Sequence, residues 1–313
     1  MQEIIIPKPL QITIDDMGWF CGKDGRETLE PSRTGITRRH CAEDYEIVNE
    51  IGRRLGMEIN CAFVMSEWDL DNRLKNIPGL SPCGKAWDNA AYFDKKEAKR
   101  CVDVINSSKY IDVAIHGLQH TYYIPGECYN NTDFYYVKDQ KLQVVPENEI
   151  RMRLNACYDL MEVNGFHKSV NSFIPPNCAY KMGHLSKILK EYNIFYVSTA
   201  FGSIFGNKEF LDVEIEDGVI IVDRNNNLIP WDQMETCLDD LPVVSGIFAC
   251  HWANVCHKCP EKNDYLTDSW VNYFQRCKKT FGVILSERMA FYATQAIYNK
   301  YSTINCTDGK YTI

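Results

Sequence analysis

The feature that most constrains the fold is a series of short apolar runs that each end in polar or titratable residues. The first is Ile12-Thr13-Ile14-Asp15-Asp16, in which an apolar run ends in two adjacent carboxylates. Helix-patterned segments separate this run from the later ones. Buried strands that alternate with helices are typical of parallel α/β folds, whose strand ends meet at one rim. The sequence therefore predicts one domain over residues 1–313, a (β/α) barrel-type fold with extended loops and its site at the C-terminal strand ends.

Apolar periodicity places the expected elements along the chain. Further strands are predicted at residues 59–65, 110–115, 170–174, 194–199 and 243–250, with one or two strands at 213–224. Helices are predicted at 40–55, 89–107, 147–164 and 183–192, followed by closing helices at about 264–300. Residues 121–145 form an aromatic insertion with the pattern of a hairpin.

Composition and charge exclude several classes of partner. The formal charge of -8 and the pI near 5.5 give no basic footprint for nucleic acid or an anionic membrane. The sequence has no apolar run near the roughly 20 residues that a transmembrane helix needs, and its first residues lack the pattern of a signal peptide. We therefore expect a cytoplasmic protein whose 14 scattered cysteines are mostly reduced and structural. The oligomeric state is not indicated.

Two motifs predict a cation site. Asp15 and Asp16 place like charges side by side, and burial raises the cost of this repulsion, so a positive group is expected near them. His116 and His120 follow another apolar run, and Gly117 between them permits a tight turn. An aspartate and two histidines form a common catalytic metal set, so a divalent metal is the expected cation.

Two further strand ends carry candidate site residues. Pro175 and Pro176 must end the strand at 170–174, because proline cannot donate to a ladder, and the segment after them can wall a pocket. His251 ends the last apolar run and is a candidate general acid. The 18 Tyr, 14 Phe and 6 Trp are compatible with an aromatic-lined cleft for sugars or other ring-shaped ligands. We expect substrate contacts from Trp19, Trp68, Pro176, Asn177 and Trp252.

In content and chain order, these motifs resemble those of the polysaccharide deacetylase family, also called NodB-like or carbohydrate esterase family four. The resemblance spans Asp15 to His251 and rests mainly on the Asp-Asp and His-x-x-x-His elements. It implies a distorted (β/α) barrel of the NodB-like type and a divalent metal, usually zinc, that serves to hydrolyse an N-acetyl group from a sugar.

The resemblance also implies a role for each motif residue. Asp16, His116 and His120 would bind the metal. Asp15 would be the general base and His251 the acid that protonates the leaving amine. Amide hydrolysis needs a nucleophile, an electrophile and an acid, which this set supplies.

The chain departs from the family pattern near the prolines. Ile174 stands where the family commonly has an arginine that supports the catalytic aspartate, and Asn177 replaces an aromatic residue. An arginine from the loop with Arg33, Arg38 and Arg39 is one hypothesis for the missing cation.

The expected substrate is a small or carrier-linked N-acylated sugar, most simply N-acetylated, in surface-glycan biosynthesis. The aromatic insertion and the loop around Trp68 are longer than a minimal domain needs, which favours a capped pocket over an open groove. Alternatives are a deformylase or non-sugar amidase with the same centre, or a catalytically degenerate sugar-binding protein. A competing structural zinc site would use Cys256, His257 and Cys259 with Cys250 or Cys237.

Overall fold

A ten-stranded sheet forms the centre of the computed structural model, which describes residues 7–19, 36, 38–125, 132–139, 141–201, 213–307 and 310–312. The strand order is β10, β11, β1, β2, β3, β6, β7, β9, β8, with β12 beside β1, and among these pairs only β8 and β9 are antiparallel. The bounds are β1 Pro9–Met17, β2 Ile59–Phe63, β3 Ile111–Ile115, β6 Ser172–Phe173, β7 Tyr196–Thr199, β8 Val213–Glu216, β9 Val219–Asp223, β10 Asn226–Asn227, β11 Gly246–His251 and β12 Ile284–Leu285. This mostly parallel sheet, which curls as part of a distorted barrel, confirms the predicted α/β fold class.

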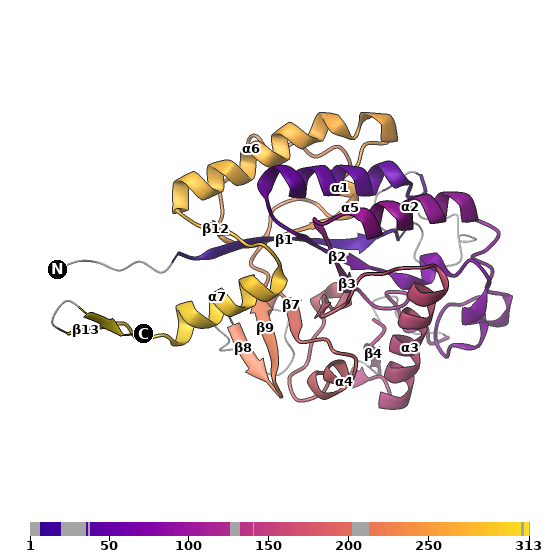
Figure 1. Ribbon diagram of the computed structural model, residues 1–313. Helices are drawn as coiled ribbons and strands as arrows, with labels where there is room; N and C mark the ends of the chain where they lie inside the picture. The colour runs from indigo at the N-terminus through magenta and orange to yellow at the C-terminus, as the bar shows by residue number, and fades with distance from the viewer. Residues whose placement is uncertain are drawn as a thin grey trace.

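The helices pack around the sheet. Figure 1 shows α6, α1 and α2 along the upper side in that view, and α7, α4 and α3 along the lower side. The bounds are α1 Ala42–Leu55, α2 Lys95–Ser107, α3 Glu147–Val163, α4 Ser186–Glu191, α5 Trp252–Val255, α6 Asp264–Phe281 and α7 Met289–Tyr301. In α1, Tyr45, Val48, Ile51 and Leu55 are buried at the three- and four-residue spacing of one helix face. Gly56 then ends α1 with a φ of 68°, which glycine adopts without strain.

The structure settles one open prediction, confirms another, shortens one strand and adds elements. Residues 213–224 form two strands, because Asp217 and Gly218 both have positive φ and make a tight hairpin turn. The strand predicted at 170–174 is only two residues long, since Pro175 and Pro176 follow it directly. The insertion contains the expected hairpin, with β4 at Tyr135–Lys138 and β5 at Lys141–Val144. The structure adds α5 and a second hairpin, β13 Asn305–Thr307 with β14 Lys310–Thr312, which the sequence analysis did not predict.

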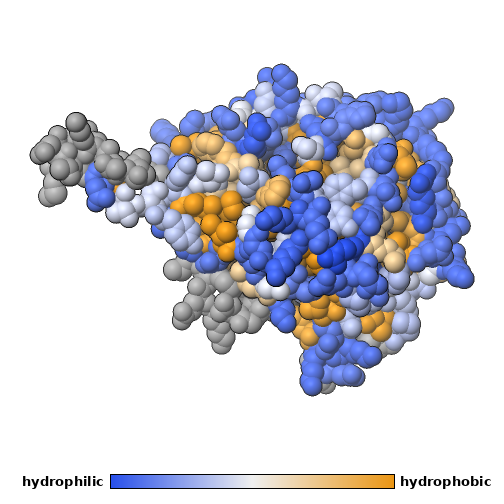
Figure 2. Space-filling view, turned by 60° about the horizontal axis from the view of Figure 1, so that its bottom comes forward, coloured by the Kyte–Doolittle hydropathy of each residue, from blue (hydrophilic) through white to orange (hydrophobic). Residues whose placement is uncertain are grey.

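The surface carries both hydrophilic and apolar residues. Figure 2 shows apolar residues as separate patches on a largely hydrophilic face. Within the described ranges, the helices are too short or too polar to cross a bilayer.

The strand β1 is an interior strand of the sheet and carries the first motif. It lies between β11 and β2, and all nine of its residues are buried. In the register of β1 with β11, Asp15 pairs with His251. Parallel pairing therefore brings the ends of the first and last motifs together.

We predict that Asp112 makes folding stability depend on pH. On β3, its carboxylate accepts a hydrogen bond of 2.7 Å from the amide of Asn60, which also donates to Ser172 Oγ at 2.8 Å. Burial raises the pKa of Asp112 to about 6, although the Asn60 hydrogen bond opposes the rise. A raised folded-state pKa stabilises the fold at low pH, and this stability is lost as the pH rises from about 4 to 6.

The expected contribution is about 2 kcal/mol in the free energy of unfolding, measured by urea denaturation across this pH range. In Asp112→Asn the decline between pH 4 and 6 should be smaller by this amount. Equal pH slopes in wild type and variant would contradict the assignment.

Candidate metal and catalytic site

A backbone irregularity brings two neighbouring carboxylates into one pocket. Asp15 and Asp16 are adjacent in β1, and successive side chains of a regular strand point to opposite faces. Both nevertheless line the same pocket. The register between β1 and β2 shifts between Ile14 and Met17, and Asp16 has a φ of 60° in the left-handed region. Bulges of this kind re-aim side chains, often next to active sites.

Asp16, His116 and His120 form a compact donor set. One ligand atom from each lies within 4.8 Å of the others, and the three residues are buried. Asp16 Oδ1 lies 3.2 Å from Nε2 of His116 and 3.8 Å from Nε2 of His120. Across the described ranges, this is the one group of three histidine, cysteine or acidic side chains with such spacing. The structure thus brings together the residues predicted as metal ligands.

The tautomer of His116 is fixed by its surroundings. Its Nδ1 lies 2.7 Å from the carbonyl oxygen of Ile174, which can only accept, so Nδ1 donates. In the neutral ring, Nε2 then carries a lone pair that faces the Asp16 carboxylate. Two acceptors at 3.2 Å repel each other unless a proton or a metal cation lies between them.

Proton affinities in the donor set follow from these contacts. Burial raises the pKa of Asp16, but the contact with His116 and the charges of His120, His116 and His251 outweigh burial and hold it well below its usual value. Burial lowers the pKa of His116, but Asp15 and Asp16 outweigh this effect and raise it above its ordinary value. The carboxylate field therefore favours a positive charge at this point.

The donor set fits a divalent cation. Asp16 Oδ1 is buried and has no hydrogen-bond donor within the part of the chain that the structure describes. The ring of Trp19 stacks on the imidazole of His120, with ring centroids 4.5 Å apart. This stacking holds the orientation of the His120 ring. A carboxylate and two neutral imidazoles, with room for further ligands, is a donor set suited to zinc.

Arg224 is the partner of Asp15, which sequence reasoning missed. Its guanidinium donates to both oxygens of Asp15, at 2.7 Å and 3.0 Å, and also to Thr13 Oγ1 at 3.2 Å. Arg224 and Asp15 are both buried. Arg224 follows directly on the apolar strand β9, so its position at a strand end was the signal that could have identified it. Asp15 is therefore paired with an arginine although none stands beside the prolines.

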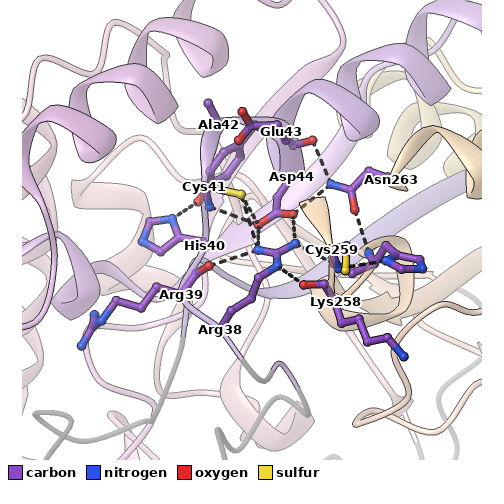
Figure 3. A network of polar contacts seen from close by, with 12 residues as sticks. Arg38, Arg39, His40, Cys41, Ala42, Glu43, Asp44, Lys258, Cys259 and Asn263 are labelled. Atoms are coloured by element: carbon purple, nitrogen blue, oxygen red, sulfur yellow. Dashed lines mark hydrogen bonds and ion pairs between the residues drawn. The ribbon is translucent and has the colours of Figure 1, made fainter. Parts of the chain in front are cut away.

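The loop with Arg33, Arg38 and Arg39 is one hypothesis for the source of the cation beside Asp15. This hypothesis is wrong for Arg38 and Arg39, which pair with other carboxylates. Arg38 donates to both carboxylate oxygens of Asp44, at 2.7 Å and 2.6 Å, and to the backbone oxygens of His257 and Lys258 (Figure 3). This network ties the segment before α1 to the segment after α5. Arg39 Nη1 lies 3.6 Å from Oε2 of Glu67. Arg33 lies outside the described residues.

The competing zinc cluster is not assembled. Cys256 is buried, and the backbone N–H of Cys259 donates to Nδ1 of His257 at 2.9 Å, which occupies a ring nitrogen that a metal would need. Neither these residues nor Cys250 and Cys237 form a metal-sized group. The cysteines whose side chains the structure describes, which include Cys237, Cys250, Cys256 and Cys259, are free thiols.

His251 lies at the rim of the same pocket. Its Nε2 is 3.9 Å from Oδ2 of Asp16 and its side chain is 19% exposed. His251 is thus placed beside the donor set and is still accessible to a bound molecule.

The pocket has a volume of about 420 Å³ and mixed polar and aromatic walls. Of the residues predicted to contact substrate, Trp19 and Asn177 line it. The residues that line it are Asp15, Asp16, Trp19, His116, His120, Asn177, Cys178, Ala200, Arg224, Asn227, Trp231, Ala249 and His251. The described part of the insertion at 121–145 contributes none of these, so the expectation that it caps the pocket is wrong for that part.

The other three residues predicted to contact substrate, Trp68, Pro176 and Trp252, are buried and do not line the pocket. Trp68 is fully buried and packs edge-on against Phe166 with ring centroids 4.9 Å apart. Trp252 is also fully buried, and its Nε1 donates to the backbone oxygen of Trp19 at 3.2 Å. Pro176 is buried against the turn at Gly117. These residues support the site from within the core.

The pocket also contains residues that the sequence analysis did not identify. Trp231 is 46% exposed at the pocket, and Asn227 lines it as well. Trp231 follows Pro230 in a segment without helical or strand periodicity. A tryptophan in such a loop could have indicated a binding residue, because it does not belong to the buried face of a helix or strand.

Three comparisons with known proteins were made, against family models, curated proteins and solved structures. No family model matches the sequence, and no curated protein is significantly similar to it. Similar solved structures include a Mycobacterium smegmatis protein assigned to the polysaccharide deacetylases, at 11% identity and a TM-score of 0.48, covering 99% of this chain and 97% of the other. The 4-alpha-glucanotransferase of Thermococcus litoralis has 14% identity and a TM-score of 0.48, covering 92% and 40%.

The family 4 carbohydrate esterase of Streptomyces lividans, in complex with acetate, has 10% identity and a TM-score of 0.36, covering 90% of this chain and 100% of the other. Similar structures thus include members of the family that the motifs resemble.

We predict that Arg224→Met lowers the free energy of unfolding by about 3–5 kcal/mol, measured by urea denaturation, because it leaves Asp15 buried without its cation. The double variant Asp15→Asn/Arg224→Met, which removes both charges, should recover much of this loss. Single and double variants of equal stability would contradict the importance of this ion pair.

Proposed function

We propose that this protein is a metal-dependent hydrolase that removes an N-acetyl group from a sugar. The observation that carries the proposal is the convergence of three groups in one pocket. These are the donor set of Asp16, His116 and His120, the carboxylate of Asp15, and the imidazole of His251. Amide hydrolysis needs an electrophile, a base and an acid, and the three groups match these needs.

Asp16, His116 and His120 would hold the metal. A divalent cation at this point, such as zinc, polarises a carbonyl and lowers the pKa of water. The donation from His116 Nδ1 to the Ile174 oxygen keeps Nε2 directed at the ligand position.

Asp15 is the proposed general base. The two hydrogen bonds from Arg224 fix the plane of its carboxylate. A carboxylate offers about four lone-pair positions, so two are left after the Arg224 contact to accept a proton from the attacking water. Arg224 thus orients the base without blocking it.

His251 is the proposed general acid. It stands at the end of β11, paired in register with Asp15 at the end of β1. Its partly exposed ring can reach a molecule in the pocket and give a proton to the departing amine, which is a poor leaving group without one.

The pocket walls support a sugar as the substrate. Trp231 offers an exposed aromatic face, and Asn177 and Asn227 offer amide groups that can pair with hydroxyls. A volume of about 420 Å³ is in the range of small-molecule pockets. The proposed substrate is an N-acetylated sugar, free or linked to a carrier, in the synthesis of a surface glycan.

The first test combines metal removal with two variants. A chelator should abolish acetate release from N-acetylated sugars and zinc should restore it. Asp15→Asn and His251→Ala should each lower kcat by roughly 10²- to 10⁴-fold, since each removes one proton-transfer group, while zinc is still bound. N-formyl sugars and non-sugar amides assayed in parallel identify the acyl group.

Full activity of the metal-free protein would refute the proposal. Asp15→Asn and His251→Ala proteins with the kcat of wild type on every substrate would also refute it. That outcome would favour a sugar-binding protein.

The second test concerns Trp231. Replacing it with alanine should raise KM about tenfold and leave kcat nearly unchanged, since ring stacking contributes to binding and not to proton transfer. Tyr265→Ala is the matched control, because Tyr265 is an exposed aromatic on α6 that does not line the pocket. An unchanged KM in Trp231→Ala would show that the sugar does not stack there.

A further inference from the structure

Asp133 is a fully buried acidic residue that lies next to the site without lining its pocket. It belongs to the insertion at residues 121–145 and precedes β4. Its carboxylate lies against the turn that connects His116 and His120. A buried charge of this kind is costly, and its partners indicate what it does.

The carboxylate holds the backbone of that turn. Asp133 Oδ2 accepts a hydrogen bond of 2.7 Å from the backbone N–H of His120. Both of its oxygens also lie within hydrogen-bond distance of the backbone N–H of Gln119, at 3.2 Å and 3.3 Å. Hydrogen bonds to a charged acceptor are stronger than neutral ones, so these contacts fix the backbone of the second histidine.

The shape of the turn depends on this contact. His120 has a φ of 62°, in the left-handed region that non-glycine residues rarely adopt. Gly117 has a φ of 98°, and a Cβ added there would overlap Asp133 Oδ2. The turn therefore closes directly on the carboxylate, and the Asp133 hydrogen bond offsets the strain at His120.

Arg153 anchors the carboxylate to the scaffold. Its guanidinium lies on α3, is almost completely buried, and donates to Asp133 Oδ1 at 3.0 Å. A second nitrogen of Arg153 donates to the backbone oxygen of Pro78. Its charge also lies over the ring of Tyr122, 5.1 Å from the centroid. Asp133 is thus held both by the turn and by α3.

We propose that Asp133, anchored by Arg153, is a positioning residue that sets the turn between the two histidines so that their Nε2 atoms converge on one cation. This inference rests on the proposed role of His116 and His120 as metal ligands. Residues behind the ligands of a metal site typically change metal affinity 10- to 100-fold when they are replaced.

The test is the zinc affinity of variants, measured by competition with a chromophoric chelator. Asp133→Asn keeps the size of the side chain but removes its charge, and it should bind zinc 10- to 100-fold more weakly. Gly117→Ala, which pushes against the carboxylate, should also weaken zinc binding. Asp44→Asn is the matched control, because Asp44 is equally buried and also pairs with an arginine, Arg38, away from the pocket. Its zinc affinity should equal that of wild type.

The outcomes separate this inference from the proposed function. A folded Asp133→Asn protein with the zinc affinity of wild type would overturn the positioning role. If Asp133→Asn does not fold, the second variant is Arg153→Lys, which keeps the positive charge but loses the two-pronged guanidinium. Arg153→Lys should bind zinc more weakly than wild type. An unchanged zinc affinity would overturn the positioning role. Weaker zinc binding in these variants, in a protein inactive on every acylated sugar, would support the positioning role and refute the proposed function.

Discussion

The placement of two adjacent, buried carboxylates in one pocket is the constraint on which the site depends. A regular strand would direct Asp15 and Asp16 to opposite faces, and the left-handed residue at Asp16 removes that alternation. Each carboxylate then needs its own positive neighbour, because two uncompensated charges in a buried site would destabilise the fold. Arg224 compensates Asp15, and the imidazoles facing Asp16 leave a position for a cation. Adjacent residues of one type thus acquire different roles through different partners.

Backbone atoms contribute to the site as much as side chains do. The carbonyl oxygen of Ile174 fixes the tautomer of His116, at the point where Pro175 and Pro176 end the short strand β6. Position 174, where the resembling family commonly has an arginine, acts here through its main chain. The cation that the family places at that position comes instead from Arg224, after β9. The positive charge beside Asp15 thus comes from a different strand end. This is possible because the ends of parallel strands meet at the same rim.

The parts of the chain expected to contact substrate mostly support the site from behind. Trp68 and Trp252 are fully buried, because large aromatic side chains next to strand ends fill the space between helices and sheet. Asp133, from the insertion expected to form a cap, instead contacts the turn at His120. The pocket leaves Trp231 exposed for a ligand. A buried supporting layer of this kind holds the side chains of the pocket in place.

By itself, the sequence determined the alternation of strands and helices and the placement of Asp16, His116 and His251 at strand ends, because hydrophobic periodicity and motif spacing are local properties. Tertiary structure alone decided which charges pair and which aromatic residues are buried. Asp15 and Arg224 are 209 residues apart, and nothing local in the sequence couples them. The burial of Trp68 and the exposure of Trp231 likewise depend on how distant segments pack around the sheet. Ion pairs and burial arise from contacts between segments far apart in the chain, and only the complete fold brings those segments together.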